Sequence, residues 1–232
     1  MNPNIAIAIL LITFVLLIMI KCPITFSMII STAFTMLYIQ VPVMTLVQQM
    51  SKQLNSFSLL AIPFFILMGE IMAAGGISSR LLAFANVCVG QITGGLAHVN
   101  VLASMLFGGI SGSAIADVSS LGALEIPMME EAGYEKDFSI AVTVASSCQG
   151  LIIPPSHNMV LYSMVAGGVS VGSLFCAGYI PGIMLGVFIM GMCYIISKKK
   201  HYPKGKKLPF KEALRVTKDT FFAMLAMVII IG

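Results

Sequence analysis

Charge is scarce in this sequence of 232 residues. Asp, Glu, Lys and Arg together make up 9% of it, whereas an ordinary soluble domain has about 25%. Hydrophobic residues make up 58%, and the mean hydropathy is +1.00. This composition excludes a soluble globular chain and predicts an all-α polytopic membrane protein.

Motifs of catalysis and of metal binding are also missing. There is no nucleophile elbow, no zinc-protease motif and no phosphate-binding glycine loop followed by Lys-Ser/Thr, which argues against an enzyme and against ATP-driven transport by this chain. The five cysteines are scattered and form no CxxC pair, so we interpret them as small buried hydrophobic residues. Tryptophan is absent, which excludes a Trp belt at the membrane surface.

Apolar segments fill most of the chain, and several approach the ~20 residues that cross a bilayer as a helix. They are Ile5–Ile20, Pro23–Ile39, Phe57–Ala74, Leu81–Val89, Val99–Leu106, Phe138–Ile153, Met159–Val165 and Leu174–Ile196.

The basic residues lie almost entirely in one place. Nine of the thirteen Lys and Arg residues fall between Lys198 and Lys218. The positive-inside rule predicts a cytoplasmic loop here, which we favour over nucleic-acid binding. Counting the membrane spans back from this loop places Lys21, Arg80 and Lys136 on the cytoplasmic side of the membrane and only Lys52 on the outer side.

This count requires residues 81–124 to make no net crossing. We favour an interfacial arm helix over 81–98, followed by a re-entrant helical hairpin over 99–130 that turns at Gly108–Ser113. Neither arm of the hairpin is long enough to span the bilayer alone. Two full crossings would return the chain to the same side of the membrane and remain the alternative.

The other predicted segments follow from the same map. Scaffold transmembrane helices occupy 1–80, transport-domain helices with a break at 150–158 occupy 138–197, a basic cytoplasmic loop occupies 198–219, and a truncated further helix starts at 220–232. Five crossings is an odd number, so a second copy would insert upside down. We therefore expect one half of an inverted-repeat transporter.

Two polar, glycine- or proline-containing breaks interrupt the apolar sequence. One is the tip at Ser111–Ala114, and the other surrounds Pro154 and Pro155. Broken helices survive in a bilayer only where they are buried in protein or line a polar cavity. Transporters use such breaks, because unwound backbone carbonyls coordinate cations there.

We predict one shared Na⁺ site at these breaks, because hydroxyls and carbonyls are hard oxygen ligands. Prolines donate no hydrogen bond and so free upstream carbonyls. Close packing of small residues is the alternative explanation. The predicted cation-site residues are Ser111, Gly112, Ser113, Ala114, Ser146, Ser147, Gly150, Pro154, Pro155 and Ser156, and Gln149 lies beside them.

Ionisable and polar groups beside the breaks are candidates for substrate contact. Asp117 either caps the returning arm or helps to hold a cation, and His157 either bonds a substrate hydroxyl or packs. Ser156 and Asn158 could cap the resuming helix. The predicted substrate-binding residues are Ser113, Asp117, Ser156, His157 and Asn158.

The remaining acidic side chains are expected to be structural or solvated. We expect Glu70 to pair with Arg80. The acidic residues at the end of the hairpin are predicted to form a solvated face: Glu125, Glu130, Glu131, Glu135 and Asp137.

Several motifs in order resemble the large membrane (M) subunit of tripartite ATP-independent periplasmic (TRAP) transporters. They are Phe107–Asp117, Gly122, Ile126-Pro127-Met128, Ala132-Gly133-Tyr134, Phe138, Ile153–Ser156, Ser173-Leu174-Phe175, Ala177-Gly178 and Pro181-Gly182. The resemblance covers the whole chain and implies the N-terminal half of that subunit.

This resemblance implies a Na⁺-coupled elevator mechanism in the bacterial inner membrane, surrounded by lipids. The implied partners are a small four-helix (Q) membrane subunit and a periplasmic substrate-binding (P) protein, and no nucleic acid is expected. The family's cation sites map onto Ser111–Ala114 and Gly150–Ser156. Ala114 departs from the common hydroxyl residue, so its side chain cannot be a ligand.

The substrate implied is an organic acid. The run Pro155–Asn158 resembles members that carry sugar acids, including sialate, more than C4-dicarboxylate carriers. A channel, or a membrane scaffold without its own cation-coupled site, remains the alternative function.

Overall fold

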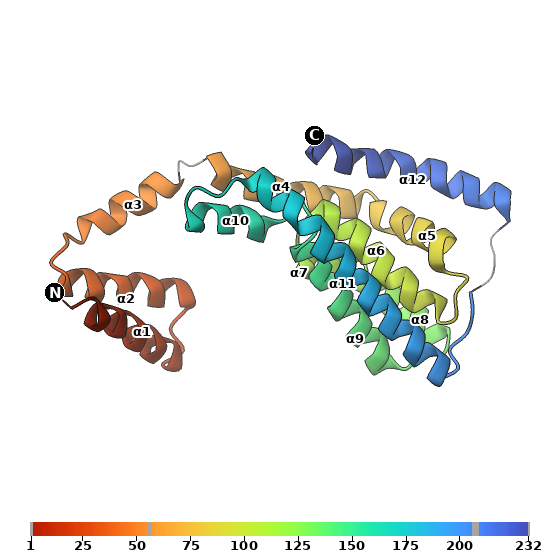
Figure 1. Cartoon of the computed structure of the whole chain (residues 1–232), viewed down its shortest axis with the longest axis horizontal. Helices are drawn as coiled ribbons and strands as arrows, with labels where there is room; N and C mark the ends of the chain where they lie inside the picture. Colours follow the sequence, from red (N-terminus) through yellow and green to blue (C-terminus); the bar gives the residue numbers. More distant parts are fainter. Residues whose placement is uncertain (1, 55–56, 206–208, 232) are drawn as a thin grey trace. The chain divides into compact units, whose positions relative to one another are not determined.

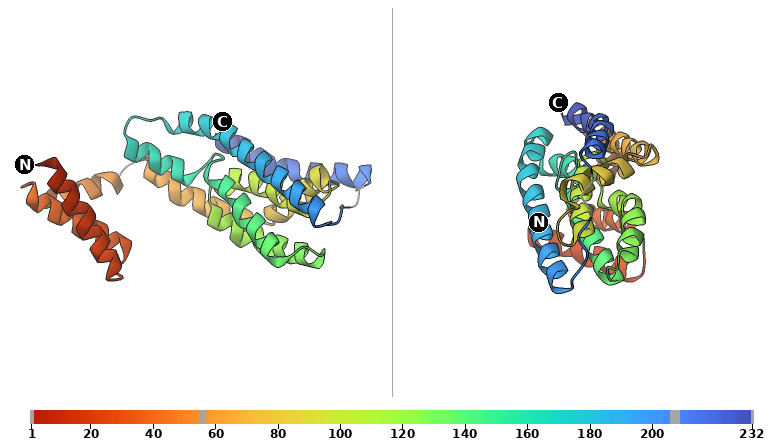
Figure 2. Two further views of the ribbon diagram at one scale, coloured as in Figure 1. Left: turned by 60° about the horizontal axis from the view of Figure 1, so that its bottom comes forward. Right: turned by 90° about the vertical axis from the view of Figure 1, so that its right-hand side faces the viewer.

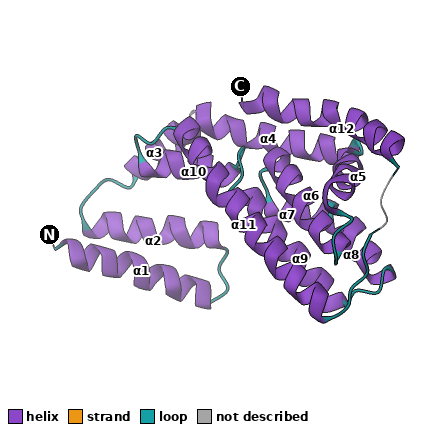
Figure 3. Cartoon of the chain, turned by 45° about the vertical axis from the view of Figure 1, so that its right-hand side comes forward, coloured by secondary structure: helices purple, strands orange, loops and turns teal. Residues whose placement is uncertain are grey.

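A computed structural model describes residues 2–54, 57–205 and 209–231, and these are helices joined by loops (Figures 1 and 3). Within this described part, the extended pairing is one isolated bridge between Thr93 and Lys204. The all-α prediction is therefore confirmed. The chain divides into two compact units between Leu60 and Ala61, and each is described by itself.

The first unit contains α1 (Pro3–Met19), α2 (Ile24–Tyr38) and α3 (Met44–Leu54). α1 and α2 pack as a pair and coincide with the first two apolar segments. Buried hydroxyls on α2 are satisfied within their own helix, as where Ser27 donates to the Pro23 carbonyl at 3.2 Å. The apolar pattern does not predict α3, because its polar and apolar residues lie on opposite faces.

The second unit is built on α4 (Phe57–Ala74), α5 (Ile77–Val89) and α6 (Gly95–Ser111). α4 belongs to this unit from Ala61 onward. Leu81 of α5, Phe107 of α6 and Met72 of α4 belong to one buried apolar cluster. Burying a side chain of this size contributes about 1.5–3 kcal/mol. The predicted arm over 81–98 is corrected by these bounds: α5 starts at Ile77, and residues 95–98 belong to α6.

The helical hairpin consists of α6, α7 (Ala114–Ser120) and α8 (Gly122–Glu131), as Figure 1 shows. α6 ends at Gly112, which has a left-handed φ of 61°. The chain then reverses, and both α7 and α8 pack against α6. The hairpin shape is as expected. That its turn re-enters the membrane stays a prediction.

The broken segment consists of α9 (Lys136–Ser147), the 3₁₀ turn η1 (Cys148–Leu151) and α10 (His157–Ala166). Residues 152–156 between η1 and α10 are not helical, so the predicted break is present.

α11 (Val171–Lys199) has 29 residues and is, in the described part of the chain, the single continuous helix long and apolar enough to cross a membrane. α1, α2 and α6 are shorter apolar helices. α11 lies beside α6 and α9, as both views in Figure 2 also show.

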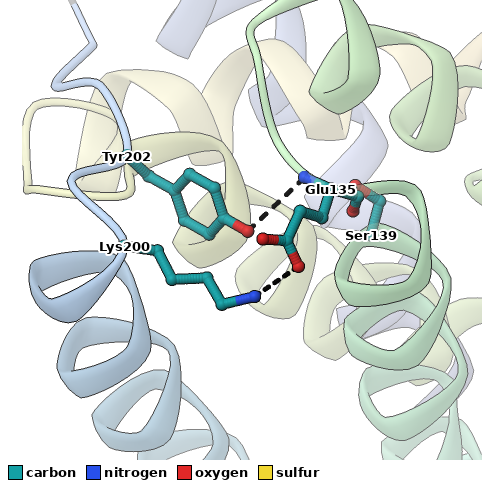
Figure 4. Close-up of polar contacts among 4 residues, drawn as sticks. All are labelled: Glu135, Ser139, Lys200 and Tyr202. Atoms are coloured by element: carbon teal, nitrogen blue, oxygen red, sulfur yellow. Dashed lines mark hydrogen bonds and ion pairs between the residues drawn. The ribbon is translucent and has the colours of Figure 1, made fainter.

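Residues 200–205, here named the strap, connect the end of α11 to two neighbouring turns, and Figure 4 shows the contacts of Lys200 and Tyr202 with Glu135. The Gly94 amide donates to the Pro203 carbonyl at 3.2 Å. Tyr202 stacks on Tyr134 with ring centroids 4.3 Å apart, and its phenol oxygen accepts from the Glu135 amide at 3.4 Å. Lys200 forms an ion pair with Glu135.

The surroundings of the strap also affect two ionisable groups. Burial raises the pKa of Tyr134 to about 12, so this phenol stays neutral and packs as an aromatic ring. The hydrogen bond to Glu135 raises the pKa of Lys200, so the ion pair stays charged at neutral pH.

α12 (Phe210–Ile231) corrects the predicted boundary between the basic loop and the last helix. The loop was expected to run to residue 219, but Lys211, Arg215 and Lys218 lie on the helix. Charged residues at helical spacing do not prevent a helix whose other face packs, and α12 packs against α5. Lys206 and Lys207 lie outside the described residues.

Candidate functional site

The hairpin tip is organised by its two serines. Ser113 is the N-cap of α7, and its hydroxyl accepts from the Ala116 amide at 3.4 Å. The Ser111 hydroxyl accepts from the Ser113 amide at 3.3 Å. Ser113 therefore caps the returning arm, and the proposed capping role of Asp117 is not what the structure shows.

The tip and the break are in direct contact. A Cβ atom added to Gly112 would lie 2.4 Å from the Pro155 carbonyl oxygen. One added to Gly108 would lie 2.5 Å from the Cα atom of Gly150. Both contacts are closer than any side chain allows, so backbone meets backbone here. The two predicted breaks therefore lie against each other, and a Na⁺ site shared between them stays a prediction.

The break leaves backbone carbonyls without their usual helical partners. The Ile153 amide donates to the Gln149 carbonyl at 2.8 Å. Pro154 has no N–H to donate to the Gly150 carbonyl, and Pro155 has none to donate to the Leu151 carbonyl. The Leu151 carbonyl accepts from the Ser156 hydroxyl at 2.7 Å. Ser156 stands at the N-cap of α10 but makes no capping bond, so its predicted capping role is wrong.

The hydroxyls before the break are already engaged within the protein. Ser146 donates to the side-chain oxygen of Asn100 at 2.8 Å, and Ser147 donates to the Val144 carbonyl at 2.8 Å. The buried amide of Gln149 faces α11, because a Cβ atom on Gly186 would lie 2.6 Å from its Oε1. Gln149 therefore does not face the hairpin tip.

A cavity of about 420 Å³ opens beside the tip, between α4, α7 and the start of α10. Its lining mixes hydroxyl, carboxylate, imidazole and apolar groups: Ile66, Gly69, Glu70, Ser111, Ser113, Ile115, Ala116, Ser119, Ser120 and His157. Such a mixture can hold a small polar organic molecule.

Three cavity residues depart from the sequence-based expectation. Glu70 lines the cavity, and no ion pair joins it to Arg80 in the described structure, so that predicted pairing is wrong. Ser119 and Ser120 were not predicted. They follow Ala116 by three and four residues and therefore share its face of α7, and this helical spacing was the available signal.

The predicted substrate-binding residues divide into two groups. Ser113 and His157 line the cavity. Asp117 is only 1% exposed and does not line it, Ser156 is buried in the break, and Asn158 is exposed outside the cavity lining. The structure therefore brings two of the five predicted residues to this cavity.

The acidic end of the hairpin also needs one correction. Glu130, Glu131, Glu135 and Asp137 are exposed as predicted. Glu125 is only 3% exposed, and its helix α8 packs against α6, α7 and α9. Its predicted place on the solvated face is wrong.

Comparison with known proteins adds an independent observation. Residues 11–232 match the family model described as "Tripartite ATP-independent periplasmic transporter, DctM component".

Several relatives are similar to this chain. The sialic acid TRAP transporter large permease protein SiaM of Vibrio cholerae is 43% identical over 211 residues, which is 90% of this chain and 49% of that protein. The C4-dicarboxylate TRAP transporter large permease protein DctM of Pseudomonas aeruginosa is 43% identical over 176 residues, 76% of this chain and 41% of that protein. The 2,3-diketo-L-gulonate TRAP transporter large permease protein YiaN of Escherichia coli is 36% identical over 211 residues, which is 90% of this chain and 49% of that protein. The chain thus spans about half the length of the curated relatives it matches.

Proposed function

Because the chain belongs to the DctM component family of tripartite ATP-independent periplasmic transporters, we propose that it is part of the large permease subunit of a secondary transporter that imports an organic acid. It is a multi-pass protein of the inner membrane. Its relatives are permeases rather than enzymes, in agreement with the absence of catalytic motifs.

We propose further that transport is driven by Na⁺ and that the ion binds where the tip meets the break. The observation that supports this site is the backbone contact of Gly112 with Pro155 and of Gly108 with Gly150. A Cβ atom on Gly150 would also lie 3.7 Å from the Ser113 carbonyl oxygen, which supports a site between Gly150 and the serine-rich tip, and backbone carbonyl oxygens are hard ligands that suit Na⁺. The hydroxyls of Ser111 and Ser113 and the tip backbone through Ala114 would complete the set.

The cavity beside this contact is the proposed substrate site. The Ser113 hydroxyl and the His157 imidazole can donate hydrogen bonds to a carboxylate. The Ser119 and Ser120 hydroxyls donate to backbone carbonyls of α7, and their oxygens can accept from hydroxyl groups of a substrate. A sugar acid such as sialate offers both kinds of group, whereas a C4-dicarboxylate offers two carboxylates. We favour the sugar acid, because the cavity already contains the Glu70 carboxylate.

The proposed mechanism is an elevator in which the hairpin and the broken segment move as the transport domain past scaffold helices. The contact of the tip with the break favours one moving body over two. The proposed partners are a small four-helix (Q) membrane subunit and a periplasmic substrate-binding (P) protein. Both belong to the whole transporter, of which this chain is a part.

Uptake of labelled organic acids into proteoliposomes tests the function. The complete large subunit, the small subunit and the binding protein are reconstituted together, with and without a Na⁺ gradient. We expect saturable, Na⁺-dependent uptake that requires the binding protein. Uptake that is linear in substrate concentration would favour a channel, and unaltered uptake after substitution of Ser113 and Pro154 would favour a scaffold.

A further inference from the structure

Glu125 is a buried carboxylate that the proposed transport site does not use. It lies on α8, is 3% exposed, and neither of its side-chain oxygens has a hydrogen-bond partner in the described structure. One turn earlier, a Cβ atom on Gly122 would lie 3.0 Å from the Thr143 side chain of α9. α8 is thus pressed closely against α9, with little room for water.

The groups that α6 and α9 present to the hairpin interior are polar but neutral. The Asn100 amide donates to the Thr143 hydroxyl at 2.8 Å, and the Ser146 hydroxyl donates to Asn100 at 2.8 Å. Ser104 and Ser146 are 3.1 Å apart. These groups form hydrogen bonds with one another rather than with Glu125.

The charged and titratable groups around Glu125 supply no counter-charge. Asp117 on α7 acts on it electrostatically and has the same sign. His98 on α6 is directed to Tyr194 of α11, with ring centroids 6.4 Å apart. Lys136 and Asp137 of α9 are exposed at the first turn. The single ion pair of the described residues joins Lys200 to Glu135.

A carboxylate ion in such surroundings is strongly disfavoured, because nothing replaces the water that it has lost. Burial within this unit also leaves little surface at which another subunit could reach it. We propose that Glu125 is a proton-binding site of the hairpin, protonated while α8 is packed against α9. Release of the proton then loosens this packing. The inference goes beyond the proposed Na⁺-driven transport and does not depend on it.

Infrared spectroscopy of the purified complete subunit tests the protonation directly. The neutral acid has a carbonyl stretching band that the carboxylate lacks. We expect this band at neutral pH in the wild type and in Glu130→Gln, whose carboxylate is exposed on the same helix. Glu125→Gln loses the part of this band that Glu125 contributes, so the difference spectrum between the wild type and this variant shows it. Identical spectra of the wild type and Glu125→Gln in this region would overturn the proposal.

Thermal melting at several pH values provides a second measurement. In the unfolded chain Glu125 ionises near its ordinary pKa of about 4.3, so above that pH the folded state binds one proton more than the unfolded state. Stability then falls as pH rises, and each pH unit lowers the folding constant up to about tenfold. We expect Glu125→Gln to reduce this slope and Glu130→Gln to retain it.

Two other outcomes would contradict the proposal. A lower melting temperature of Glu125→Gln at neutral pH would indicate a basic partner for an ionised Glu125. Failure of Glu125→Gln to accumulate, while Glu130→Gln does, would mean the same, because the amide imitates the neutral acid. Neither readout requires transport, so a failed Na⁺ dependence of uptake leaves this test intact.

Discussion

Backbone atoms rather than side chains make the contact between the hairpin tip and the break. Gly112 combines a left-handed φ of 61° with a position where a Cβ atom would meet the Pro155 oxygen at 2.4 Å. Gly133 has a φ of 89° but open space around it. Comparing an alanine substitution at each glycine therefore separates two contributions to the free energy of unfolding: the left-handed backbone conformation and the contact with Pro155.

We expect Gly112→Ala to destabilise the protein more than Gly133→Ala. The left-handed conformation costs either alanine about 1–2 kcal/mol. Overpacking at the tip adds about 1–3 kcal/mol for Gly112→Ala alone. Thermal melting measures the difference, and Na⁺-dependent uptake should be lost only in Gly112→Ala. Equal effects of the two substitutions would mean that the contact is unimportant.

Residue roles were predictable from the sequence only where the signal is local. Gly112, Pro154 and Pro155 interrupt a helix by their own chemistry, so the two breaks could be predicted. The burial of Glu125 could not, because it depends on which helix packs over α8. Glu70 was assigned to Arg80 from proximity in sequence, whereas the fold turns it to the cavity.

At the scale of elements, the break itself can be tested. If the carbonyls beside Pro154 and Pro155 bind Na⁺, replacing both prolines with alanine should let the helix close and withdraw these ligands. We expect the Na⁺ concentration for half-maximal uptake to rise at least about tenfold, which corresponds to about 1.4 kcal/mol. The measurement is initial uptake rate against Na⁺ concentration at matched membrane abundance.

Pro127→Ala is the matched control for this double substitution. Pro127 lies exposed inside α8, where the helix continues through it. It should leave the Na⁺ dependence unchanged. An unchanged half-saturation in the double variant too would leave the break as a packing feature.

The strap is a second element whose contribution can be measured. Tyr202 stacks on Tyr134 and lies 5.3 Å from the Phe138 ring centroid. We expect Tyr202→Ala to destabilise the purified protein by about 3 kcal/mol, as for other buried aromatic residues. Tyr202→Phe should cost only about 1 kcal/mol, because it keeps the ring and loses one hydrogen bond.

Lys200→Ala serves as the comparison for the ion pair in Figure 4. Water solvates and screens an exposed ion pair, so it contributes little to stability, and this variant should melt close to the wild type. If Lys200→Ala proved as destabilising as Tyr202→Ala, charge rather than ring stacking would hold the strap.

Elements with a uniform apolar sequence were predicted well, and amphipathic ones were not. α1, α2 and α11 follow from apolar runs alone. α3 and the first half of α12 carry enough polar residues to look like loops, but both are amphipathic, and α12 packs against α5. The bounds of α5 and α6 were likewise shifted, because helix ends depend on capping and on neighbouring turns.

At the scale of the whole molecule, the orientation in the membrane is the prediction to test. Nine basic residues between Lys198 and Lys218 make translocation of this segment costly. Reporter fusions at Lys204 and at Lys218 should therefore be active in the cytoplasm. A fusion before α1 should report the periplasm.

A periplasmic reporter at Lys204 would invert the whole map. It would also move the hairpin entrance to the other side of the membrane. Cysteine labelling at Ser113 with impermeant reagents, in a background without the five native cysteines, checks the same assignment independently.

The meeting of Gly112 with Pro155 and of Gly108 with Gly150 also bears on how such proteins diversify. A contact built from backbone tolerates almost no substitution, yet its carbonyls do not depend on side-chain identity. The neighbouring cavity is lined by side chains at Ser119, Ser120 and His157, which single mutations can exchange. If the proposed sites are correct, selection can change the substrate through the cavity lining while the proposed ion-binding backbone stays the same. Grafting only the cavity residues of a relative should then alter substrate preference without changing the dependence of uptake on Na⁺.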